Sequence, residues 1–141
     1  MSNKNLLSGR DKELQELAEH YETARENNEP FYADADDLAD LADWYAVHNK
    51  VQQAHEAVEY GLNLHPDNTA LLVQQAYLFM DSHNKDKARE VADRISDDYS
   101  SEVKVLKASL MLSEGKIDDA EQLLDTIEDK ENLANIIEVA Y

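Results

Sequence analysis

The sequence predicts an all-α fold built from consecutive helix pairs. Only three glycines and two prolines occur in 141 residues, while Ala, Leu, Glu, Asp and Lys dominate, so the chain favours helices over a sheet. Apolar residues recur at i, i+3, i+4 and i+7, which is the spacing of one helix face. Similar stripes return at a nearly constant interval, which indicates a repeated architecture.

The composition limits the kinds of partner. With 43% hydrophobic residues, the chain has enough apolar surface for one folded domain. Thirty-one acidic residues against thirteen lysines and arginines give a formal charge of -18. Such a surface repels phosphate backbones and anionic lipid, so we expect neither nucleic acid nor a membrane as the partner.

Cysteine is absent, which excludes disulfides, thiolate metal sites and cysteine nucleophiles. No apolar run has the length of a signal-peptide core or of a membrane span. We therefore expect a cytoplasmic protein. The alternative is an exported protein from which the signal has been removed.

Residues 1–33 are expected to form a capping helix and a tether. One apolar stripe lies in this segment, and the next begins at Leu38, too soon for a second helix between them. We predict one helix over about 11–27, followed by a tether through the motif NNEPFY. The residues of the first stripe are Leu14, Leu17, Ala18 and Tyr21.

Residues 34–132 are expected to form three helix pairs, at about 35–66, 69–99 and 101–131. The first pair opens with the acidic motif YADADDLADLADWYA, in which aspartates that cap and start a helix are interleaved with an inward apolar stripe. The motif does not match a calcium loop, because the sixth place from Asp34 is Ala39 and the twelfth is Tyr45. The stripes of the successive first helices are Leu38, Leu41, Ala42 and Tyr45, then Leu72, Ala76 and Phe79, then Ala108 and Met111.

Small residues recur where the two helices of a pair are expected to cross. In the first pair these are Ala42, Ala54 and Gly61, and larger side chains there would push the helices apart. The later pairs have Ala76, Ala88, Ala108 and Ala120 at the matching places.

Residues 133–141 extend the pattern into the first helix of a further repeat, which stops at Tyr141. No second helix would cover the apolar face of Ile136, Val139 and Ala140. Because terminal repeats normally carry a polar outer surface, we expect the chain to be the N-terminal fragment of a longer repeat protein.

The repeated motif resembles that of the tetratricopeptide repeat family, from about residue 35 to the end. Later pairs depart from the family pattern, since Gln75 and Lys107 replace an expected Leu, and Ser100 and Asn132 stand where Pro is expected. The resemblance implies a right-handed α-solenoid whose first helices line a concave groove for a peptide or a partner's helix. The signature residues are Leu38, Leu41, Ala42, Tyr45, Ala54, Val58 and Pro66.

The resemblance also implies which residues face the groove. Family members that hold acidic chaperone tails have a clamp of Lys, Asn and Arg there, whereas this chain has Ala39, Asp43, Gln74, Glu102 and Leu106. We therefore expect a different ligand. The groove-facing positions are Asp36, Ala39, Asp40, Asp43, Ala46 and Val47, then Ala70, Val73, Gln74, Tyr77, Met80 and Asp81, then Glu102, Val105, Leu106, Ser109, Leu112 and Ser113.

Three aspartates are the first candidates for partner binding. Asp36, Asp40 and Asp43 form a row of like charge at i, i+4 and i+7, and each like pair costs about 0.2 to 0.5 kcal/mol. A local cost without local compensation is typical of a binding face, and the alternative is a solvated surface. Tyr77, Met80 and Leu106 complete the predicted binding set, although Tyr77 and Met80 would equally suit a contact with a neighbouring helix.

Catalytic and metal motifs are lacking. The sequence has no HExxH, no nucleophile elbow and no Gly-rich phosphate loop, so we expect no enzyme, cofactor or metal. The leading hypothesis is a scaffold that binds a basic or basic-apolar peptide or helix in the groove. The alternative is a structural spacer that self-associates as a homo-oligomer through Ile136, Val139 and Ala140.

Overall fold

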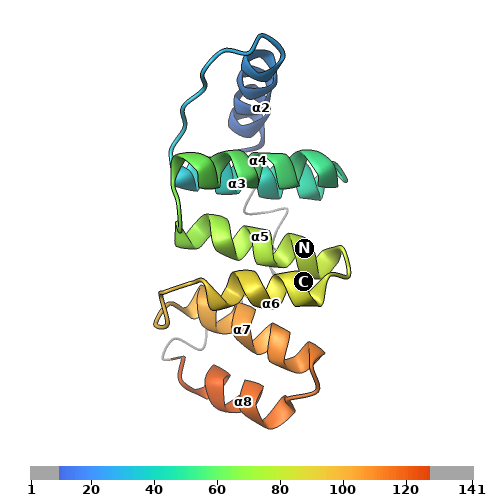
Figure 1. The fold of residues 1–141 in the computed structure, drawn as a ribbon, viewed down its shortest axis with the longest axis vertical. Helices are drawn as coiled ribbons and strands as arrows, with labels where there is room; N and C mark the ends of the chain where they lie inside the picture. Colours follow the sequence, from blue (N-terminus) through green and yellow to red (C-terminus); the bar gives the residue numbers. More distant parts are fainter. Residues whose placement is uncertain (1–9, 128–141) are drawn as a thin grey trace.

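The computed structural model describes residues 10–127, and this part of the chain contains seven α-helices and no strand (Figure 1). The predicted all-α class is therefore confirmed. The helices are α2 (Asp11–Glu26), α3 (Ala35–Val47), α4 (Val51–Leu64), α5 (Thr69–Asp81), α6 (Lys85–Asp93), α7 (Ser101–Ser113) and α8 (Ile117–Asp125).

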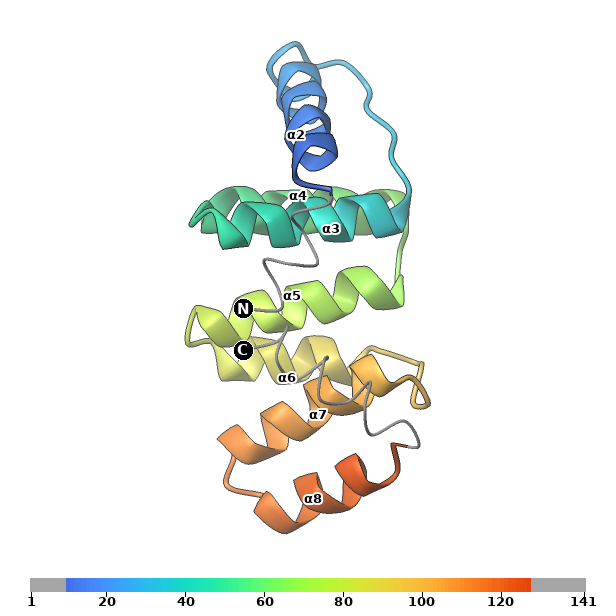
Figure 2. The same ribbon diagram turned by 180° about the vertical axis from the view of Figure 1, so that it is seen from behind.

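The helices follow one another down the long axis of the molecule, from α2 at one end to α8 at the other (Figure 1). They contact as three pairs, α3 with α4, α5 with α6 and α7 with α8, and α2 packs on α3. Between pairs, α5 contacts both α3 and α4, and α7 contacts both α5 and α6. The first helices α3, α5 and α7 therefore touch in series, and Figure 2 views them from the opposite side to Figure 1.

The turn inside each pair has the same backbone geometry. Two positions after the last residue of each first helix stands a residue with positive φ, namely Asn49 (62°), His83 (59°) or Gly115 (81°). The next residue donates its N–H to a carbonyl five residues back, which is the Schellman arrangement that satisfies a free helix carbonyl. The three bonds are Lys50 N to Tyr45 O, Asn84 N to Phe79 O and Lys116 N to Met111 O, each 2.8 Å.

The end of α2 repeats this turn. Asn28 has φ of 54°, and the N–H of Glu29 donates to the carbonyl of Ala24 at 2.8 Å. An extended tether follows in place of a second helix. The hydroxyl of Tyr60 on α4 donates to the Phe31 carbonyl and accepts from the Phe31 N–H at 3.2 Å, so the tether is fixed to α4.

Small side chains fill the contacts inside the pairs. Ala42, Ala54, Ala76 and Ala88 are 0% exposed. At Gly61 a Cβ would lie 2.9 Å from Leu71 Cδ2 and 3.4 Å from Leu38 Cβ, so α4 passes α3 and α5 at a distance that only glycine allows without repacking.

Helix starts differ in how they are capped. The side chains of Asn68, Asn84 and Ser100 accept backbone N–H bonds at the starts of α5, α6 and α7. Asp34 is at the N-cap of α3 but makes no side-chain cap bond, which differs from the expectation for the acidic motif. Its charge still lies at the positive end of the helix dipole.

The second pair is shorter than its predicted range of 69–99, because α6 ends at Asp93. The polar run after it forms a connection instead of a helix. The Asp97 side chain accepts the backbone N–H groups of Tyr99 at 2.8 Å and Ser100 at 3.1 Å, which competes with helical hydrogen bonds.

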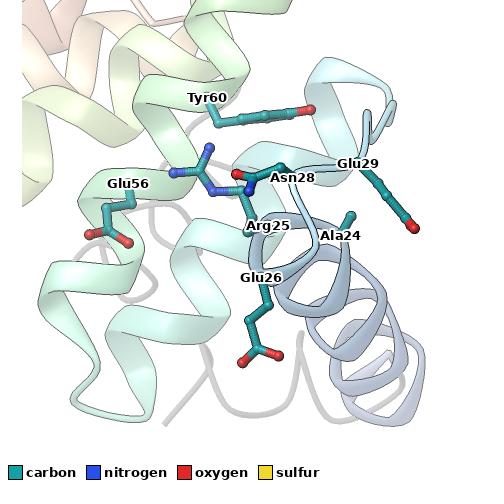
Figure 3. Close-up of a pocket in the computed structure, with 7 residues that line it drawn as sticks. All are labelled: Ala24, Arg25, Glu26, Asn28, Glu29, Glu56 and Tyr60. Carbon is teal, nitrogen blue, oxygen red and sulfur yellow. The ribbon is translucent and has the colours of Figure 1, made fainter.

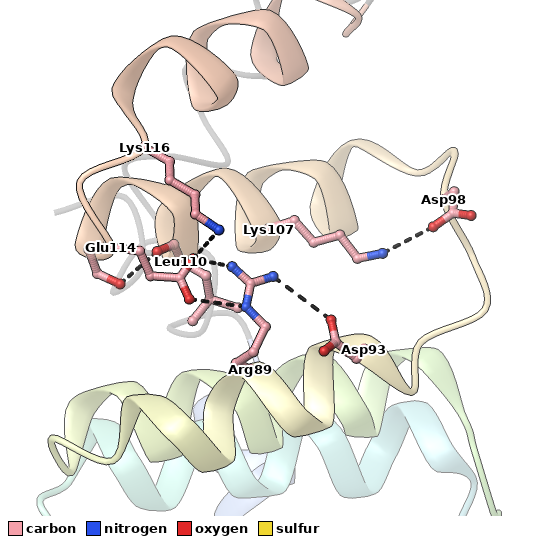
Figure 4. Close-up of polar contacts among 8 residues, drawn as sticks. Arg89, Asp93, Asp98, Lys107, Leu110, Glu114 and Lys116 are labelled. Carbon is pink, nitrogen blue, oxygen red and sulfur yellow. Dashed lines mark hydrogen bonds and ion pairs between the residues drawn. The ribbon is translucent and has the colours of Figure 1, made fainter.

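Charged groups join α6 to the end of α7 (Figure 4). Arg89 donates to both carboxylate oxygens of Glu114, with Nε to Oε2 at 3.2 Å, and also lies 3.8 Å from Asp93. The hydrogen bonds from Arg89 lower the pKa of Glu114. Lys107 pairs with Asp98 at 3.0 Å beside this contact.

The Gly61→Val variant is expected to lower the free energy of unfolding by about 2 to 3 kcal/mol, because the new side chain must displace buried Leu71 and push against Leu38. Urea denaturation measures the loss. Gln53→Val, at an exposed place on α4, controls for the helix propensity of valine. Equal stability of the two variants would contradict the close approach.

The Glu114→Gln variant is expected to lose about 0.5 to 1 kcal/mol at pH 7. Because the folded-state pKa of Glu114 is lowered, its contribution is present above the unfolded pKa of about 4.3 and is lost as pH falls through the lower folded value. Urea denaturation at several pH values should show the gap to the unsubstituted protein closing in acid. A gap independent of pH would contradict the ion-pair assignment.

Candidate functional site

The aspartates of α3 form a row along one side of the helix. Asp36 is exposed, whereas Asp40 and Asp43 are partly buried. The inward residues Leu38, Leu41, Ala42 and Tyr45 pack into the core with α2 and α4, and this packing turns the aspartate row away from α4.

Asp40 has a basic partner that the sequence did not indicate. Arg10, the residue before α2, pairs through Nη1 with Asp40 and through Nη2 with Asp37 at 3.2 Å. Burial raises the pKa of Asp40, and the charge of Arg10 opposes that rise. The expectation that Asp40 lacks compensation is wrong, because the compensation comes from a residue thirty positions away that spacing within one helix cannot reveal.

Asp43 differs from Asp40 in its surroundings. Among residues 10–127 it makes no hydrogen bond or ion pair. Burial, and then the charge of Asp40, raises the pKa of Asp43 to about 6. A cation brought to this carboxylate would relieve an unfavourable charge.

A carboxylate of α7 belongs to the same surface. Burial raises the pKa of Glu102, and the charges of Asp36 and Asp40 raise it further. Acidic groups from the first and third helix pairs therefore lie close enough to repel one another. We use the name α3–α5–α7 face for these acidic groups together with two half-buried residues of α5, the helix that contacts both α3 and α7. Its residues are Asp36, Asp40, Asp43, Tyr77, Met80 and Glu102.

The α5 part of this face is partly apolar. Tyr77 and Met80 are half-buried and pack against the core formed by α5, α6 and α7. At the helix ends, Val47 of α3 remains 37% exposed and Leu112 of α7 45% exposed. Asp81 ends α5, and burial raises its pKa.

The expected role of Leu106 requires a correction. Its side chain is 0% exposed and belongs to the core cluster of α5, α6 and α7. Val105 and Ser109 on the same helix are also buried, at 2% and 7% exposed. The resemblance to the repeat family implied that these residues face the groove. In the structure they lie on the buried side of α7, so Leu106 is not accessible to a partner. The predicted self-association residues Ile136, Val139 and Ala140 lie outside the described residues.

The structure also has a pocket that the sequence did not indicate (Figure 3). Its volume is about 450 Å³, and it lies where the end of α2 and the tether meet α4. The guanidinium of Arg25 lies over the rings of Tyr60 and Tyr21, at 5.4 and 5.8 Å from the ring centroids. The lining residues are Ala24, Arg25, Glu26, Asn28, Glu29, Glu56 and Tyr60.

The chemistry of this pocket is limited by its lining. The lining contains the carboxylates of Glu26, Glu29 and Glu56 and the Tyr60 hydroxyl, and it includes no Ser, Thr, His or Lys. In residues 10–127 no group of three His, Asp or Glu side chains is arranged to hold a metal ion. No helix in the described part of the chain combines the length and apolarity needed to cross a membrane.

Comparisons with known proteins give no family. No protein-family model matches the sequence, and no curated protein matches it.

The Asp43→Asn variant is expected to raise stability by about 1 to 2 kcal/mol at pH 7.5. A carboxyl with a raised folded-state pKa opposes folding once ionised, so the gain should vanish below about pH 4 and grow as pH rises through about 6. Thermal and urea denaturation measure it. Asp36→Asn, at an exposed place on the same face, makes the same charge change and should stabilise less.

Proposed function

We propose that this chain is a non-catalytic protein-protein interaction scaffold, a right-handed α-solenoid of tetratricopeptide-like repeats that binds a basic or basic-apolar peptide or helix along the α3–α5–α7 face. The observation that carries the proposal is the row of Asp36, Asp40 and Asp43 along one side of α3, together with the raised pKa of Glu102 on α7, to which the charges of Asp36 and Asp40 contribute after burial. A cationic ligand bound to these carboxylates would lower their repulsion.

The repeated Schellman turns support the repeat architecture. Three first helices end in the same backbone geometry at intervals of thirty-four and thirty-two residues, and each pair contacts the next. Identical turns and a serial pattern of contacts are what stacking of one structural unit produces. In such a stack the first helices form one continuous surface, so the α3–α5–α7 face would be the concave side.

The apolar component of the ligand is inferred from the same face. Tyr77 and Met80 are half-buried residues of α5, the helix that contacts both α3 and α7. A flexible thioether beside an aromatic ring adapts to apolar side chains of varied shape. Val47 and Leu112 add exposed apolar surface at the helix ends. The proposed ligand therefore combines cationic with apolar side chains.

The proposed function is of the binding class, and the proposed location is the cytoplasm, with which the lack of cysteine is compatible. The electrostatic part of the interaction should depend on salt, because the carboxylates of the face remain partly exposed to solvent.

Neutralising the face is expected to weaken binding of a basic-apolar peptide. The double variant Asp36→Asn, Asp43→Asn should bind a ten-residue peptide of alternating Arg and Leu about ten-fold more weakly than the unsubstituted protein, measured by isothermal titration calorimetry. The matched control removes two exposed acids elsewhere, Glu19→Gln with Glu59→Gln, and should change affinity less than about two-fold. Equal losses in both variants would indicate attraction by net charge alone and would contradict a binding face.

A further inference from the structure

The acidic end of the α3–α5–α7 face already holds a guanidinium in the free protein. Arg10 contacts Asp40 through Nη1 and Asp37 through Nη2, and its Nε lies 3.4 Å from Glu13. The two aspartates belong to α3, whereas Arg10 precedes α2, so the cation comes from a different element of the fold.

The geometry of this contact is specific to arginine. The two terminal nitrogens bind carboxylates that stand three residues apart on one helix. A planar guanidinium presents donors in a fixed fork and can bridge two such groups, whereas a lysine ammonium is a point charge. An arginine of a partner that reached α3 from solvent could make the same two contacts, with Asp37 and Asp40.

The contact is open to exchange. The side chains of Arg10, Asp37 and Asp40 are 38%, 45% and 43% exposed, so water and a competing cation can reach them. Ion pairs at that exposure are individually weak. Asp43 adjoins Asp40 on α3 with no basic partner in the described part of the chain, so it offers an incoming cation a first contact.

Exchange at Arg10 would leave α2 in place. The indole Nε1 of Trp44 donates to Asp11 at 2.8 Å, and the hydroxyl of Tyr45 donates to Glu22 at 2.8 Å. The buried side chains of Leu14, Ala18 and Tyr21 hold the helix to the core. The ion pairs of Arg10 can therefore break without undocking of α2.

We propose that Arg10 is an internal stand-in for a partner's arginine, which occupies Asp37 and Asp40 in the free protein and is displaced when the partner binds. This inference rests on the proposed function. It adds that the cation recognised at this end of the face is arginine, and that Arg10 competes with the partner's arginine for Asp37 and Asp40. The competition lowers affinity for the partner by the free energy of the Arg10 contacts.

The test compares two variants of the full chain that make the same charge change. Arg10→Gln removes the stand-in, and Lys12→Gln removes an exposed cation two residues away that forms no hydrogen bond or ion pair among the described residues. The probe is the peptide of alternating Arg and Leu, with a Lys and Leu version for comparison. Isothermal titration calorimetry should give about three- to ten-fold tighter binding of the Arg peptide to Arg10→Gln, a change below about two-fold for Lys12→Gln, and a smaller gain with the Lys peptide.

The outcomes separate this inference from the function on which it rests. If the Arg peptide binds the unsubstituted protein and loses affinity when Asp36 and Asp43 are neutralised, but Arg10→Gln binds no tighter, Arg10 is a structural contact only and the inference is wrong. If no variant binds either peptide, the proposed function fails and the inference fails with it.

Should circular dichroism show that Arg10→Gln is unfolded, Arg10→Lys replaces it. Lysine keeps the charge but lacks the planar fork that places one nitrogen on each aspartate, so it should give a smaller tightening, and unchanged or weaker binding would overturn the inference.

Discussion

Close contact between paired helices at alanine and glycine positions is the constraint on which the rest of the structure depends. Ala42, Ala54, Ala88 and Ala120 are 0% exposed, and Gly61 has no room for a Cβ beside Leu71. Because paired helices meet through such short side chains, their crossing is fixed within narrow limits. That crossing sets which side of each first helix packs against the second helix of its pair. The sides that are not covered by this packing contribute to the α3–α5–α7 face.

The distribution of charge follows from this arrangement. Residues 10–81 contain sixteen acidic and four basic residues, whereas residues 82–116 contain seven of each. The balanced part forms ion pairs between elements, such as Arg89 with Glu114 and Lys107 with Asp98. In the acidic part Arg10 pairs with Asp40, the middle residue of the aspartate row, and with Asp37, and Asp43 is left without a basic partner among the described residues. The uncompensated charge is thus concentrated in the part of the chain that runs from α2 to α5.

Helix positions were the most predictable feature. Periodic apolar stripes and capping residues act within a few positions of the chain, so they placed the helices that begin near residues 35, 69 and 101. The end of α6 was not predicted, because the hydrogen bonds of Asp97 with Tyr99 and Ser100 compete with a helix and leave no trace in apolar spacing. The direction of Leu106 was also missed, since position in a repeat does not report how far a helix is rotated about its axis.

The sequence by itself determined the all-α class, the helix pairs and the small residues at their crossings, because helix periodicity and side-chain size are local properties. It also determined the row of Asp36, Asp40 and Asp43. Only the tertiary structure decided which of these carboxylates have a basic partner. Arg10 pairs with Asp40, whereas Glu102 of α7 is another acidic group that Asp36 and Asp40 repel. These residues are far apart in the chain, and their distances depend on how successive helices stack, which no local pattern encodes.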